Sequence, residues 1–304
     1  MQTQIFNTIL NVDPTRTLTL RKALVSALNK RFRALKGLVN ESVITNDCFG
    51  LNITVNEALN PGEFAFLTDP EKVQQFMEWF KTNITLGVLE LSNTEQIGTA
   101  VNAFWLNQYL TTSYKKGMQR ARTELTKAGY AVPSARSVSA DFNLPIHADR
   151  VGLLYTRAYK GLKGITDEVD KQVSGVLAQG MAEGKGPREI AREINGRIDS
   201  IGKHRSTLLA RTEIIRAHHH ATIQEYKNWG AVGVTVLAEW QTAGDSRVCE
   251  RYNALARKKT KFGNGVYTLD QALGLIPNHP GCRCICLPLD ITDNIELRRK
   301  LEDG

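Results

Sequence analysis

The chain has 304 residues, of which 42% are hydrophobic and 23% charged, values typical of a folded protein with a sizeable core. Its formal net charge of +8 favours polyanionic partners, above all nucleic acid, through nonspecific electrostatic attraction. The sequence has no apolar run of about 18 residues, so we expect no membrane span, and its start, MQTQIFNTIL, lacks the basic and apolar regions of a secretory signal.

Residues 1–130 are predicted to form an N-terminal helical domain. A basic amphipathic stretch, Thr19–Val39, favours one helix, and Asp69-Pro70-Glu71 is typical of the start of another. Apolar residues follow that start at helical spacing: Val73, Phe76, Met77 and Phe80. A further long helix is expected from about Glu95 to Lys127, before Gly129.

Polar residues and prolines indicate a linker at 131–150, and two long helices are expected over 151–229. The first carries an apolar stripe with steps of three and four residues: Leu154, Ala158, Leu162, Ile165, Val169, Val173 and Val176. After a Gly-Pro turn, a short helix over Arg188–Ile198 resembles the start of a helix-turn-helix. A last helix, Lys203–Trp229, places His219 on its inner face and leaves His218 and His220 exposed.

A small β module is predicted over 230–289, followed by a charged C-terminal tail at 290–304. Strands are expected at Val232–Thr242 and Cys282–Leu289, with a hairpin turn signal at Asn264-Gly265 between them. The predicted fold class is therefore α+β and predominantly α-helical: an N-terminal helical domain, a long-helix region and a small C-terminal β module that contains cysteine and histidine.

Four of the five cysteines lie in this module, and such an odd, clustered set fits a reducing compartment better than a secreted disulfide framework. The candidate ligands of a zinc site are Cys249, His279, Cys282, Cys284 and Cys286. A buried layer of plain thiols and a disulfide are open alternatives to zinc. His279 could also activate a cysteine, but no third catalytic group stands at a recognisable spacing, so we expect no enzyme.

The same module contains a concentration of basic residues that could meet the phosphates of double-stranded DNA without reading its sequence. The residues are Arg247, Arg251, Arg257, Lys258, Lys259 and Lys261. A solvated loop that binds nothing is the equal alternative.

Three segments together resemble the phage head morphogenesis family, typified by Mu F-like minor head proteins. They are ARTEIIRAH from Ala210 to His218, WQTAGDSRVC from Trp240 to Cys249, and HPGCRC from His279 to Cys284. The similarity covers roughly 148–288, half of the chain. The family often has a second cysteine three residues after the first; here that position is Tyr252, and Cys286 is additional.

The resemblance implies a minor capsid protein of a tailed phage, without enzymatic activity, that acts in procapsid assembly, DNA packaging or DNA delivery. Its implied partners are the portal protein, the major capsid or scaffold protein, and double-stranded DNA. The implied location is the capsid interior near the portal, with the host cytoplasm during assembly. The alternative function is a DNA-binding protein that uses Arg188–Arg197 and a zinc-stabilised C-terminal module.

Overall fold

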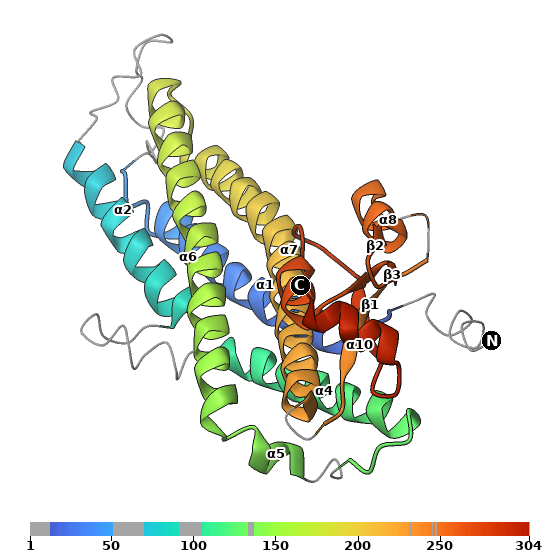
Figure 1. Cartoon of the computed structure of the whole chain (residues 1–304). Helices are drawn as coiled ribbons and strands as arrows, with labels where there is room; N and C mark the ends of the chain where they lie inside the picture. Colours follow the sequence, from blue (N-terminus) through green and yellow to red (C-terminus); the bar gives the residue numbers. More distant parts are fainter. Residues whose placement is uncertain are drawn as a thin grey trace, which may run out of the picture. The chain divides into compact units, whose positions relative to one another are not determined.

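The computed structural model describes residues 13–50, 70–90, 105–132, 137–230, 233–244, 246 and 248–303. It is mostly helical, with a small antiparallel sheet near the C-terminus (Figure 1), which confirms the predicted α+β class. In the described ranges, no helix is both long enough and apolar enough to cross a bilayer.

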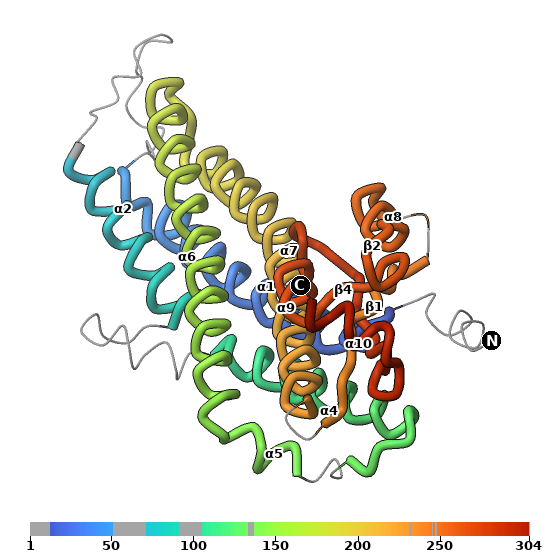
Figure 2. Tube along the Cα trace, viewed as in Figure 1, coloured from blue at the N-terminus to red at the C-terminus, as the bar shows by residue number. Residues whose placement is uncertain are grey.

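The helices precede the sheet in the chain. In order they are α1 (Leu18–Asn40), η1 (Glu41–Thr45), α2 (Pro70–Ile84), η2 (Thr85–Leu89), α4 (Asn107–Lys127), α5 (Val138–Asp141), α6 (Pro145–Ala182) and α7 (Pro187–Gly230). The C-terminal part follows, as the trace in Figure 2 shows. It consists of β1 (Val236–Gln241), α8 (Glu250–Arg257), β2 (Lys259–Thr260), β3 (Gly263–Asn264), β4 (Val266–Tyr267), α9 (Leu269–Leu275), β5 (Ile285–Asp290) and α10 (Ile295–Glu302).

The chain divides into two compact units, each built from separate segments. Unit 1 comprises Met1–Ala23, Leu106–Thr156 and Leu208–Gly304, and unit 2 comprises Leu24–Trp105 and Arg157–Thr207. This division differs from the sequential one predicted at 1–130, 131–150 and 151–289, because α6 and α7 each contribute to both units.

Unit 2 is helical, and its part of α7 contains the short helix predicted at Arg188–Ile198. That helix does not end there: α7 continues as one helix to Gly230, so it is not separate from the helix predicted at Lys203–Trp229. Phe32 of α1 packs against Gly202, inside the expected break, with ring atoms 3.1 Å from where a Cβ would stand. A nearby ion pair joins Lys36 to Asp199 at 2.7 Å.

In unit 1, α4 and α7 approach each other closely because small residues line the contact. A Cβ on Gly117 would overlap the backbone carbonyl oxygen of His218 and stand 2.8 Å from the Cβ of Ala221. The Ser113 hydroxyl donates to the Ile214 carbonyl at 2.6 Å, and the Thr222 hydroxyl lies 3.2 Å from the Gly117 carbonyl. A side-chain hydroxyl of each helix therefore contacts a backbone carbonyl of the other, in addition to the close packing.

The sheet of unit 1 has the strand order β4-β1-β5 and is antiparallel. Along β1, alternate residues enter different cores, as a pleated strand requires. Ala238 and Trp240 belong to the core that includes Ile215 and Tyr226 of α7. Leu237 belongs to a second core. The predicted charged tail contains α10, whose Leu297 and Leu301 pack against that second core.

Candidate functional site

The loop before β5 is attached to α7 through two adjacent side chains of the helix. The N–H of Gly281 donates to Thr212 Oγ1 at 3.1 Å, and Thr212 donates in turn to the Leu208 carbonyl at 2.7 Å. Arg211 reaches the Gly281 carbonyl at 3.4 Å. Gly281 has a φ of +83°, a conformation that glycine adopts at little cost. The loop is thus held on both sides of this glycine.

The same loop meets the start of α8 through His279. Nδ1 of His279 lies 2.8 Å from the Pro280 carbonyl, which can only accept, so Nδ1 carries the proton of the neutral ring. Nε2 therefore accepts from the Cys249 thiol, 3.1 Å away. The Tyr252 ring stacks on the imidazole at 4.5 Å between centroids, and its hydroxyl accepts the His279 N–H at 3.2 Å.

Cys282 and Cys284 follow immediately and are buried in the core that also contains Trp240 and Tyr252. A hydrogen bond from Cys284 lowers the pKa of Cys282 to about 6; burial opposes the shift and a hydrogen bond from Tyr252 adds to it. The same bond to Cys282, together with burial, raises the pKa of Cys284. Burial raises the pKa of Cys286, which is paired with Trp240 across the sheet.

These contacts bring together all three segments on which the family resemblance rests. In a comparison with known families, residues 171–287 match the model of the Phage Mu protein F like proteins. This part of the chain is a Mu F-like region. The matched range includes every residue of the three segments. No curated protein and no solved structure matches the chain.

Within the Mu F-like region, four of the five predicted zinc ligands are arranged as two pairs, and the fifth, Cys286, lies opposite Trp240 in the sheet. Cys249 faces His279, Cys284 faces Cys282, and Tyr252 contacts one member of each pair. A structural zinc ion needs about four ligands converging on one point. Among the described residues, no group of three or more histidine, cysteine or acidic side chains is arranged to hold a metal ion. In this arrangement the donors do not fit a tetrahedral site, and zinc binding stays a prediction.

Beside Cys249 and His279 lies a small cavity, which Tyr252 and Arg283 also line. Its volume of ≈ 20 Å³ is enough for about one water molecule. All five cysteines of the chain are free thiols in the structure. The Cys249–His279 pair therefore lies in a tight junction and not in a cleft of substrate size.

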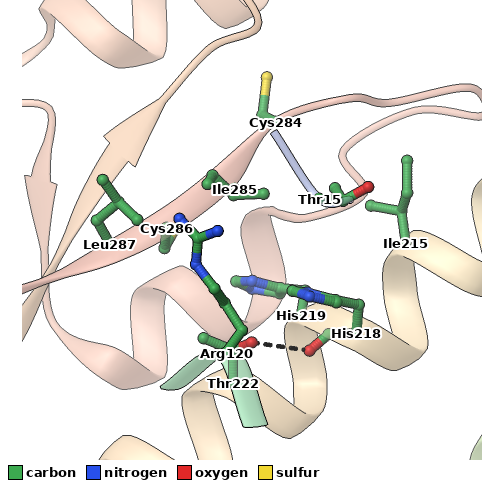
Figure 3. Close-up of a pocket in the computed structure, with 10 residues that line it drawn as sticks. All are labelled: Thr15, Arg120, Ile215, His218, His219, Thr222, Cys284, Ile285, Cys286 and Leu287. Carbon is green, nitrogen blue, oxygen red and sulfur yellow. Dashed lines mark hydrogen bonds between the residues drawn. The ribbon is translucent and has the colours of Figure 1, made fainter. Parts of the chain in front are cut away.

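The histidines of α7 differ from the prediction. Both His218 and His219 are buried, whereas only His219 was expected inside. The helix packs on two sides: the His218 backbone meets α4 at Gly117, and His219 Nε2 donates to the Ala272 carbonyl of α9 at 2.8 Å. Figure 3 shows both rings near Arg120, around a cavity of ≈ 10 Å³ that Cys286 also lines.

The basic residues predicted to meet DNA are exposed where the structure describes them. Arg251 and Arg257 lie on α8, and Lys258, Lys259 and Lys261 lie at and after its end. Arg247 is outside the described residues. Arg251, Arg257 and Lys258 border one groove, which Lys259 and Lys261 do not line.

Two groups of this region were missed by sequence reasoning. Arg211 and Thr212 of α7 hold the Gly281 loop, although neither was among the predicted site residues. Tyr252 was read only as a missing cysteine, yet it joins His279 to Cys282. A tyrosine hydroxyl in place of a family cysteine is itself a signal, because it supplies a hydrogen-bonding group at the same position.

Proposed function

We propose that this chain is a minor capsid protein of a tailed phage that associates with the portal protein and acts in procapsid assembly, DNA packaging or DNA delivery. The observation that carries the proposal is the Mu F-like region at 171–287, with its three characteristic segments joined in one junction. We further propose that the protein lies in the capsid interior near the portal.

The role that we propose is architectural and not catalytic. Hydrogen bonds and buried thiols join α7, α8 and β5 at the junction, and the cavity beside Cys249 and His279 holds about one water molecule. His279 Nδ1 faces the Pro280 carbonyl, so the imidazole is oriented by backbone and not by a carboxylate. Such a junction is suited to a rigid module that takes part in protein assembly. We propose the major capsid protein or the scaffold protein as a further partner.

Proximity to packaged DNA is supported by the exposed cations after α8. Lys259 begins the first strand of a short hairpin and Lys261 lies in its turn; both side chains are exposed and could meet phosphates without base recognition. Binding of this kind weakens steeply with salt. The alternative function, a regulator that reads DNA with Arg188–Arg197, gains no support: these residues are the first turns of the single helix α7 and not a separate recognition helix.

The test is co-expression of the full chain with the portal protein of the same phage, followed by native mass spectrometry. We expect a complex whose mass gives the copy number and any bound metal. The portal protein of an unrelated phage is the matched control and should not form the complex. If no complex forms with the cognate portal over a range of salt concentrations, portal association is wrong.

A further inference from the structure

A groove opens in the C-terminal module between α8, the end of α9 and Asn278 in the loop that follows α9. It has a volume of ≈ 490 Å³ and is lined by Ala254, Leu255 and Leu275 together with Arg251, Arg257 and Lys258. The two leucines are half-buried and pack against the core that contains the cysteines. The groove therefore has an apolar floor that rests on the protein core, with three cations at its edge.

The cations of this groove are available to a ligand. Arg251, Arg257 and Lys258 are exposed, and within the described parts of the chain none forms an ion pair with a carboxylate. Arg257 and Lys258 lie at the C-terminal end of α8. A ligand that satisfies the whole groove must be acidic at its edges and apolar at its centre.

We propose that this groove binds an acidic peptide segment of a partner protein. One apolar side chain of the segment inserts between Leu255 and Leu275, and flanking carboxylates meet Arg251, Arg257 and Lys258. Charge complementarity selects the acidic flanks. The apolar base selects a protein over duplex DNA, because a phosphate backbone would cover those leucines without filling the space between them. The inference is separate from the proposed function and holds whichever partner carries the segment.

The chain offers a matched pair of variants. R257E/K258E reverses two charges at the groove, whereas K259E/K261E reverses two charges on the adjacent hairpin, outside the groove lining. Both variants change exposed side chains and give the same net charge. A third variant, Ala254→Trp, fills the groove from an exposed position and leaves the charge unchanged.

The experiment measures binding of the full chain by fluorescence anisotropy. The probe is a synthetic peptide with a central leucine flanked by glutamates; its control has serine in place of leucine. We expect saturable binding that R257E/K258E weakens about tenfold or more, since two charge-assisted contacts are lost, while K259E/K261E changes it less than about twofold. Ala254→Trp should weaken it as well, and the serine peptide should bind poorly.

Four outcomes would overturn the proposal. The first is no binding of the leucine peptide. The second is equal binding of the serine peptide, which makes the apolar base irrelevant. The third is equal weakening by both double variants, the mark of nonspecific attraction. The fourth is competition between duplex DNA and the peptide, combined with loss of DNA binding in R257E/K258E but not in K259E/K261E. That result would make the groove a DNA-binding surface.

Discussion

Thr212 Oγ1 accepts the backbone N–H of Gly281 at 3.1 Å and so joins two segments that are 69 residues apart in the chain. The threonine hydroxyl gives its own proton to the Leu208 carbonyl, which leaves a lone pair directed at the loop. Through this bond α7 determines where the loop turns before Cys282 enters the core. The bond therefore links the long helix of the Mu F-like region to its β module.

Replacement of Thr212 by valine should destabilise unit 1. Valine keeps the shape but removes the acceptor, so the Gly281 N–H loses its partner, at a cost of about 1–3 kcal/mol. Urea unfolding measures the change in the free energy of unfolding, and hydrogen exchange at the Gly281 amide should accelerate. Thr207→Val is the matched control, since Thr207 makes the same bond to the carbonyl four residues back but is exposed. Equal losses from both variants would contradict the role given to Thr212.

Gly117→Ala should disrupt the contact of α4 with α7. The new methyl group would overlap the His218 carbonyl, which is backbone and cannot turn aside, so the helices must separate. Overpacking of this kind costs about 1–3 kcal/mol or more. Gly152→Ala on α6 is the control, because that site has free space and helical glycine is less stable than alanine by about 1 kcal/mol. A thermal melt should shift downward for the first variant and not for the second.

Local patterns in the sequence were sufficient for much of the helical architecture. The Asp-Pro-Glu signal predicted the start of α2, which begins at Pro70. The apolar stripe predicted after Leu154 is buried at every position through Val176. An apolar stripe can be recognised from the sequence of one helix alone, because it depends only on which side of that helix is apolar.

The incorrect predictions concern residues whose burial or backbone conformation depends on a segment distant in the sequence. His218 is buried because α4 approaches α7 at Gly117, a contact that no local pattern reveals. Gly265 does have the positive φ that the Asn264-Gly265 signal predicts, but it does not form a hairpin turn. The β2–β3 hairpin turns at Lys261 and Phe262, and Gly265 links β3 to β4. A Cβ on Gly265 would stand 2.5 Å from the Ala256 carbonyl oxygen, so packing against α8 also demands glycine there.

The buried histidines predict a loss of stability in acid. Burial, together with the charges of Arg120, His219 and Lys116 and opposed by Asp13, lowers the pKa of His218 from 6.5 to about 3. Burial also lowers the pKa of His219, from 6.5 to about 4. The Ala272 carbonyl raises the pKa of His219 and Arg216 lowers it. Below pH 6.5 the unfolded chain therefore binds more protons than the folded protein does. The contribution of these two histidines to the free energy of unfolding is fully present above pH 6.5 and is lost as the pH falls towards 4 and 3.

His218→Gln should make the free energy of unfolding fall less steeply with decreasing pH, since one buried imidazole no longer takes up a proton on unfolding. The free energy of unfolding, measured by urea titration at a series of pH values, gives the slope for each variant. His204→Gln serves as the control because His204 is exposed. Identical slopes for the wild type and His218→Gln would show that His218 does not cause the acid sensitivity.

The two serine variants of the β5 segment should separate a layer of buried thiols from a zinc site. In a thiol layer, a hydroxyl at position 284 can still donate to Cys282, as the thiol does, so Cys284→Ser should be mild. Cys286→Ser should cost more, about 1–3 kcal/mol, because it places a hydroxyl opposite Trp240 in an apolar core. A chelator should leave the melting temperature of the reduced protein unchanged. A zinc site at Cys249, His279, Cys282 and Cys284 requires the reverse order, together with a chelator effect that matches the loss in Cys284→Ser.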